Sequence, residues 1–168
     1  MKKNFILTYL VAALGIFSSF NALSYDGTIK FRGTILANGC TISSGKDQEV
    51  NFGKVSKNAF GSAPKTVAIT KDFSIELTSC PSDSNIEIEF SGTKDAYDPS
   101  LYSTTVSGAG ILLTKANGDQ INANTKISGY TITRGKASIP LIAKLQSTHA
   151  TVGNGTITSD VNFTLIYP

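Results

Sequence analysis

The stretch that decides the fold of this chain lies at its C-terminus and reads Gly155-Thr156-Ile157-Thr158-Ser159-Asp160-Val161-Asn162-Phe163-Thr164-Leu165-Ile166-Tyr167-Pro168. Apolar and polar residues alternate here with the period of two that is typical of a strand with one buried face. The apolar set of this strand is Val161, Phe163, Leu165 and Tyr167. The sequence ends directly afterwards, so we expect no later strand to cover its outer edge. An uncovered edge leaves main-chain groups unpaired beside an apolar groove.

Similar alternating segments recur along the chain and are separated by turn residues. Fifteen glycines, no tryptophan and many β-branched residues also favour strands over helices. We therefore predict an all-β fold, an incomplete immunoglobulin-like β-sandwich that lacks its final strand. A helical turn is predicted only near Lys57–Ala63. The predicted strands are Thr28–Ile42, Glu49–Val55, Val67–Thr78, Asn85–Ser91, Gly110–Lys115, Gly129–Thr133, Ala137–Leu145 and Thr156–Tyr167.

The first 24 residues have the features of a secretory signal peptide. Lys2 and Lys3 precede an apolar stretch, and small residues occupy the −3 and −1 positions of a cut after Ser24. The alternative is a membrane anchor, but polar residues shorten the apolar stretch below the roughly 20 residues that a span requires. We expect a mature chain that begins at Tyr25, in which 13 basic residues (15 minus two) face 12 acidic ones.

This near-neutral charge gives no electrostatic reason to expect nucleic acid as a partner. His149 is the only histidine and lies in a loop rich in serine and threonine, without an obvious nucleophile nearby. The sequence therefore predicts no catalytic site, no metal, no cofactor and no small-molecule substrate. The length of 168 residues suits one domain with a real core.

Two cysteines, Cys40 and Cys80, remain in a chain that we expect to be exported. Oxidising compartments favour pairing, so a disulfide between them is predicted. Closing a loop of about 40 residues would stabilise the fold by about 4 kcal/mol in the chain-entropy model. Redox catalysis would require a closely spaced pair, and a metal site would require further cysteines or histidines.

The start of the mature chain offers a strand that matches the one missing at its end. Between Gly27 and Ile35 the apolar face carries Ile29, Phe31, Gly33 and Ile35. Gly33 would let the main chain lie close where the receiving groove is shallow. An ordinary first strand of a closed sandwich is the alternative. We divide the chain into a signal peptide (1–24), an N-terminal donor-strand extension (25–36) and one β-sandwich domain (37–168).

Several segments, taken in this order, resemble the pilins of the chaperone-usher pathway, the type 1 fimbrial protein family, and above all its minor adaptor subunits. The resemblance covers nearly the whole mature chain. The segments are Gly27–Ile35, the first cysteine at Cys40, Phe73–Pro81, Ile86–Gly92, and the ending, with Gly155 fourteenth from the C-terminus and Tyr167 next to last.

The resemblance implies a structural subunit that is exported through the periplasm to the bacterial cell surface and contributes to adhesion within a fimbrium. In similar subunits a periplasmic chaperone grasps the strand that corresponds to Gly155–Tyr167, here with Val161, Phe163 and Leu165 on its apolar face. At the outer-membrane usher, the N-terminal extension of a neighbouring subunit then replaces the chaperone strand.

The sequence indicates the position of the subunit in the fibre less specifically than it indicates the family. A short extension before Cys40 favours a minor tip adaptor, and a major rod subunit is the alternative. A self-contained, secreted carbohydrate-binding sandwich is the third possibility; it predicts a stable monomer with a measurable ligand. An additional N-terminal lectin domain of the kind carried by tip adhesins is not expected in a chain of this length.

Overall fold

The structure is a computed structural model that describes residues 39–167. This part of the chain is built from strands and one short 3-10 helix, as predicted for an all-β protein. The elements are β1 (Thr41–Ile42), η1 (Lys57–Phe60), β2 (Val67–Thr78), β3 (Asn85–Gly92), β4 (Tyr102–Ser103), β5 (Ala109–Lys115), β6 (Gln120–Ile121), β7 (Lys126–Thr131), β8 (Ala137–Ser147) and β9 (Val161–Ile166).

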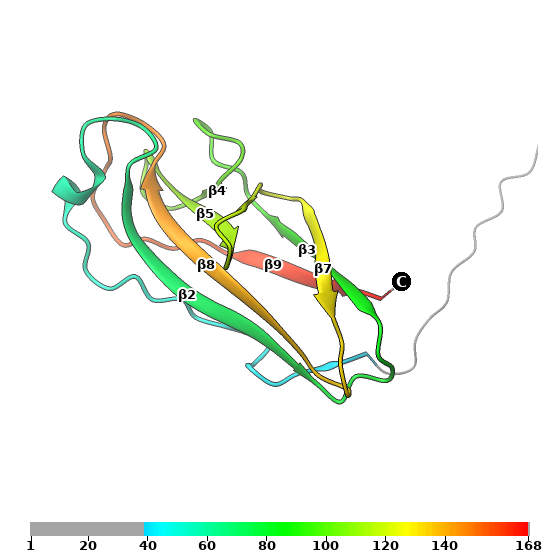
Figure 1. Cartoon of the computed structure of the whole chain (residues 1–168). Coiled ribbons are helices and arrows are strands. Elements are labelled where there is room, and N and C mark those ends of the chain that lie inside the picture. The colour runs from blue at the N-terminus through cyan, green and yellow to red at the C-terminus, as the bar shows by residue number, and fades with distance from the viewer. Residues whose placement is uncertain (1–38, 168) are drawn as a thin grey trace, which may run out of the picture. The chain divides into compact units, whose positions relative to one another are not determined.

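The strands form two antiparallel sheets (Figure 1). The larger sheet has the order β1-β2-β8-β5-β4, with β6 paired to β5, and the long strands β2 and β8 are its centre. The smaller sheet has the order β7-β3-β9. Strand β9 pairs along β3 over six residue pairs, from Gly92 opposite Val161 to Glu87 opposite Ile166. Both outer edges of the smaller sheet therefore belong to short strands.

An apolar core joins the two sheets, and a smaller buried cluster lies around Phe60, Val106 and Leu145. Ile75 and Ile139 of the larger sheet and Ile86, Ile88 and Phe90 of the smaller one belong to the same buried cluster. Alternation produces this core, because residues two apart along a strand point to the same face. In β8, for example, every second residue from Ala137 to Leu145 is buried. The predicted β-sandwich is confirmed.

The turns follow local sequence signals. Gly118, in the turn between β5 and β6, has a φ of 94° and donates its N–H to the carbonyl of Lys115 at 2.9 Å. A positive φ of this size is unfavourable for residues with a Cβ, which explains the glycine. The predicted helical turn is confirmed as η1, whose start is capped by the side chain of Ser56.

The strand predicted for Glu49–Val55 is wrong. This segment is irregular, and the Asn51 side chain accepts a hydrogen bond from the Gly53 N–H at 2.7 Å, which makes a local turn. Two other predicted strands differ at their start by more than one residue, because residues 156–160 precede β9 without strand pairing and β7 begins at Lys126 rather than at Gly129.

Of the predicted first strand, the described part forms only β1, and residues 28–38 lie outside the described range. The two-residue strands β4 and β6 were not predicted. Both strands pair with the nearby strand β5 over two residue pairs, and two residues are too few to show a periodic pattern in the sequence. Within residues 39–167, no helix is long and apolar enough to cross a membrane.

Candidate functional site

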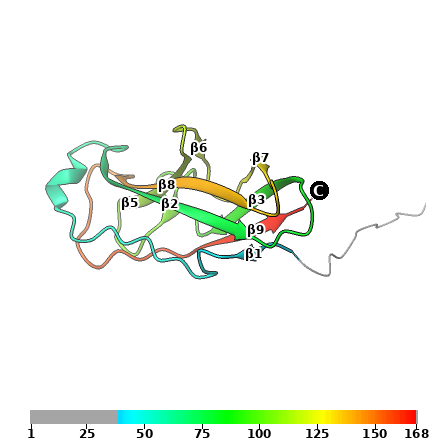
Figure 2. The same ribbon diagram turned by 60° about the horizontal axis from the view of Figure 1, so that its bottom comes forward.

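A surface groove of about 770 Å³ runs beside β9. It lies between the segment that follows β1 and the segment that leads into β9, and Figure 2 shows both passing along the same side of the sandwich. We call residues 42–52 the first rim and residues 159–163 the second rim. The floor consists of side chains from β2, β3, β5 and β8, namely Phe73, Ile75, Phe90, Ile111, Leu113 and Ala143.

The groove is apolar and only partly covered. Phe73 and Ile111 on the floor, Phe52 on the first rim and Val161 and Phe163 on the second rim are all half-buried, although they pack against the main core. Elsewhere in the sandwich, comparable side chains such as Ile139 are fully buried. A further strand that buried this exposed apolar area would stabilise the fold by about 25 cal/mol per Å² of area removed from water.

The main chain at the second rim is equally incomplete. Strand β9 pairs with β3 on one side, and across residues 39–167 no strand pairs with its other side. That side faces the groove, where Val161, Asn162 and Phe163 line the wall. Unpaired N–H and C=O groups beside half-buried apolar side chains form a template for an added strand.

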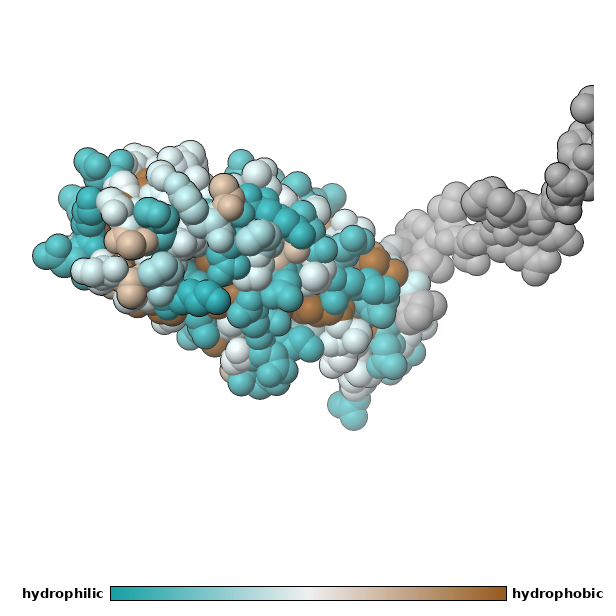
Figure 3. Space-filling model, turned by 90° about the horizontal axis from the view of Figure 1, so that it is seen from above, coloured by the Kyte–Doolittle hydropathy of each residue, from teal (hydrophilic) through white to brown (hydrophobic). Residues whose placement is uncertain are grey.

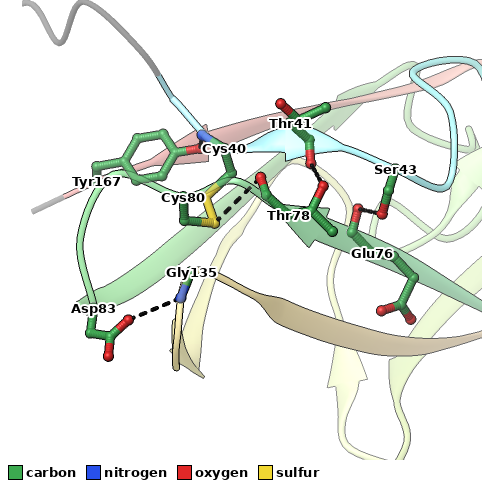
Figure 4. Close-up of a disulfide and its surroundings, with 9 residues drawn as sticks. All are labelled: Cys40, Thr41, Ser43, Glu76, Thr78, Cys80, Asp83, Gly135 and Tyr167. Atoms are coloured by element: carbon green, nitrogen blue, oxygen red, sulfur yellow. Dashed lines mark hydrogen bonds between the residues drawn. A yellow bond between two sulfur atoms is a disulfide. The ribbon is translucent and has the colours of Figure 1, made fainter.

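One end of the groove is tied together at Cys40 (Figure 4). Its sulfur is bonded to that of Cys80, which follows β2, so the predicted disulfide is confirmed. The Cys40 N–H also donates a hydrogen bond of 2.9 Å to the hydroxyl of Tyr167, directly after β9. These two bonds connect the start of the first rim to the larger sheet and to the far end of β9.

The first rim is anchored again at β2. Ser43 donates its N–H to the Glu76 carbonyl at 2.8 Å, and the Glu76 N–H donates to the Ser44 hydroxyl at 3.1 Å. A hydrogen bond from the Ser138 side chain and, to a smaller extent, one from the Ser74 side chain lower the pKa of the Glu76 carboxyl from its ordinary value. Beyond this anchor the rim, from Lys46 to Phe52, makes no strand pairing.

The segment before β9 is held at the other end of the groove by the main chain and the hydroxyl of Thr105. Thr105 donates its N–H to the Thr158 carbonyl at 3.1 Å, and its hydroxyl donates to the Thr156 carbonyl at 2.6 Å. A Cβ on Gly92 would come within 3.0 Å of the Asp160 carbonyl, so a glycine is needed for this close approach. The segment that leads into β9 is therefore fixed without being part of the sheet.

Charged side chains on the groove wall are mainly acidic. Asp47 and Glu49 on the first rim and Asp160 on the second rim are exposed, with Lys46 as the one basic residue of the described lining. In the described part of the chain, none of these three acids forms an ion pair, whereas Glu87 pairs with Lys126 at 2.6 Å. Figure 3 shows another face of the molecule, where apolar residues occur in small separate patches among hydrophilic ones.

The sequence-predicted site residues are only partly brought together. Val161 and Phe163 line the groove, while Leu165 and Tyr167 pack against the core nearer to the disulfide. Gly155 is exposed and does not line the groove. The donor residues Ile29, Phe31, Gly33 and Ile35 lie outside the described residues.

Sequence reasoning missed the first rim and most of the floor. The apolar residues Val50 and Phe52 were assigned to an ordinary strand, and nothing local marks them as a groove wall. His149 is exposed, and its ring lies 4.7 Å from that of Tyr97. Among residues 39–167 no cluster of three metal-ligating side chains is present.

Comparison with known proteins assigns this chain to a family. The family model for fimbrial protein matches residues 29–168. The chain belongs to the fimbrial protein family. This fimbrial subunit is 33% identical to long polar fimbria protein A of Salmonella typhimurium, over 99% of this chain and 97% of that protein. It is 32% identical to the probable major fimbrial subunit LpfA of Escherichia coli O157:H7, over 99% and 97%.

A chain in the structure of a chaperone-usher pilus has the same fold, with a TM-score of 0.65 at 22% identity, over 86% of this subunit and 96% of that chain. The fimbrial subunit is thus a structural component of a fimbrium, exported to the cell surface. It belongs to a family of structural proteins rather than of enzymes.

Proposed function

We propose that this subunit polymerises by donor-strand exchange: the N-terminal segment of one subunit enters the groove beside β9 of another. The observation that supports this most directly is the unpaired edge of β9 next to half-buried apolar side chains. A strand added there would pair with β9 and cover the groove at once. The same groove would accept a chaperone strand before assembly, and the usher would be the place where the two are exchanged.

The sequence of the proposed donor fits this task. Ile29, Phe31, Gly33 and Ile35 alternate with polar residues, so an extended main chain would present one apolar face to the floor. Nine residues, from Gly27 to Ile35, reach about 30 Å at 3.3 Å per residue. This exceeds the roughly 26 Å that residues 159–166, the second rim and β9, would cover if extended. Removal of residues 1–24 as a signal peptide would free this segment.

The first test adds the donor as a peptide. A synthetic peptide spanning Tyr25–Asn38 is mixed with the oxidised subunit, and thermal unfolding is followed by circular dichroism. The midpoint should rise by several degrees, because a ligand that binds only the folded state stabilises it. A stable monomer whose midpoint is unchanged by the peptide would show that the fold is already complete.

The second test changes the donor itself. Phe31→Asp should prevent incorporation into fibres, because a carboxylate would be buried on an apolar floor. Phe31→Leu, the matched control, should assemble. Chaperone binding, which uses the groove and not the donor, should be retained in both. Normal fibres from the Phe31→Asp subunit would contradict the assignment of the donor.

Two positions in the fibre remain candidates. The short extension before Cys40 favours a minor tip adaptor. The likeness to a protein named as a probable major fimbrial subunit favours a repeated rod subunit instead. Quantitative immunogold labelling separates them, since an adaptor should be found near the tips and a rod subunit along the whole fibre.

A further inference from the structure

We infer that the acidic rims of the groove select the donor strand by charge, and that the donor they fit is the N-terminal segment of a second copy of this chain. This inference rests on the proposed strand exchange and names the occupant of the groove. Three acids on the rims and two basic residues in the proposed donor support this match.

The rim acids are placed where an incoming strand would meet them. Asp160 directly precedes β9, and Asp47 and Glu49 lie on the opposite rim, so acidic groups flank the groove on both sides. All three are exposed, and none has an ion-pair partner within residues 39–167. With Lys46, the charged residues of the lining sum to two negative charges (three acidic minus one basic).

The proposed donor carries the opposite charge on the matching face. If Ile29 and Phe31 point to the floor, Lys30 and Arg32 point outward. Alternation along the second rim is equivalent, because Val161 and Phe163 face the floor while Asp160 and Asn162 lie at the intervening positions.

Outward residues of a donor beside β9 would thus neighbour outward residues of the second rim. Directly opposite side chains on adjacent strands have Cβ atoms about 5 Å apart, and diagonal ones about 7–8 Å. Lys and Arg side chains span such separations. Basic groups of the donor would therefore lie within range of Asp160 on one side and of Asp47 or Glu49 on the other.

Charges at the borders of an interface act mainly on the rate of association and on the choice of partner. A donor with acidic outward residues would be repelled from both rims, whereas one with basic residues would be attracted. Because donor and rims occur in one chain, the two faces match between identical copies. This charge match favours a fibre in which identical copies of this subunit are neighbours.

The test measures binding of a fluorescent Tyr25–Asn38 peptide to the full exported chain by anisotropy. A charge-reversed peptide, with Lys30→Glu and Arg32→Glu (the reversed peptide), should associate about tenfold more slowly at low salt. Complementary charges attract the two partners before contact, and this peptide lacks them. The difference between the association rates of the two peptides should disappear as the electrostatic screening length falls from about 30 Å at 0.01 M salt to about 3 Å at 1 M. A peptide with Lys30→Arg and Arg32→Lys keeps the charge and should behave as the original does.

A change on the receiving side completes the test. Asp160→Lys should slow the original peptide and speed up the reversed one. The matched control is Asp72→Lys, an exposed acid in β2 at a position that alternates with the groove residue Phe73. This control should change neither rate, since residue 72 faces away from the groove.

The outcomes separate the two proposals. If neither peptide binds at any salt concentration, strand exchange by this donor is wrong. If both peptides bind at the same rate at every salt concentration, strand exchange stands and charge selection is wrong. Because the peptide arm leaves the receiving chain unchanged, its result does not depend on how well the Asp160→Lys variant folds.

Discussion

The two edge strands of the three-stranded sheet, β7 and β9, differ in their residues and in their contacts. At the β7 edge, the pairing with β3 shifts its register between Ile86 and Ile88, Lys126 forms an ion pair with Glu87, and the Lys115 amine donates to the Ser128 carbonyl. At the β9 edge the pairing with β3 is regular, and apolar side chains border a groove.

The difference shows which edge is adapted for contact. Bulges, lysines and exposed polar residues are the usual means by which proteins prevent edge strands from pairing with other chains. β7 has these features, and apart from Ile127 and Tyr130 its residues are exposed. β9 has neither a bulge nor a lysine, and it presents Val161 and Phe163 to the groove. Open main-chain groups are thus protected at one edge and available at the other.

The largest expected effect concerns the bond that holds the groove together. Replacing both Cys40 and Cys80 by alanine should lower the free energy of unfolding by about 4 kcal/mol, because the unfolded chain regains the freedom of a long loop. The β9 edge should lose its structure first, since Cys40 connects the first rim to the residue after β2 and donates a hydrogen bond to Tyr167. Chemical denaturation of the variant and of the parent, each with and without the donor peptide, measures both effects. Equal stability of variant and parent would contradict this role.

A single substitution at each edge compares them directly. Phe163→Asp should weaken donor-peptide binding by at least about a hundredfold, because burying an unpaired carboxylate costs about 3 kcal/mol or more. Thr131→Asp, at the β7 edge, should leave binding unchanged. Phe163→Leu serves as the control that retains an apolar wall. Equal losses from the two Asp variants would mean that the peptide does not use the β9 edge specifically.

The smallest expected effect sharpens the account of β7. Lys126→Val removes an exposed ion pair and should change the free energy of unfolding by less than about 1 kcal/mol. It should nevertheless increase self-association, because an apolar residue replaces a charge that protects an edge strand. Light scattering at matched concentration measures the self-association. If the variant remains as monodisperse as the parent, the bulge alone is enough to protect this edge.

Much of this architecture could be predicted from local patterns. The strands β2, β3, β5 and β8 were located within a few residues, and the disulfide followed from two cysteines in an exported chain. Prediction failed where a segment looked like a strand but had no partner. Val50 and Phe52 alternate as strand residues do, yet the segment is irregular, because main-chain pairing and not alternation defines a strand.

The groove itself shows the same division between sequence and structure. The alternation from Val161 to Tyr167 determined that one face of the last strand is apolar, because residues two apart share a side. Only the tertiary structure decided that residues 42–52 form the opposite wall, that Tyr167 binds Cys40, and that Asp47, Glu49 and Asp160 flank one opening. These contacts join residues more than a hundred positions apart, and local periodicity carries no information about such distant neighbours.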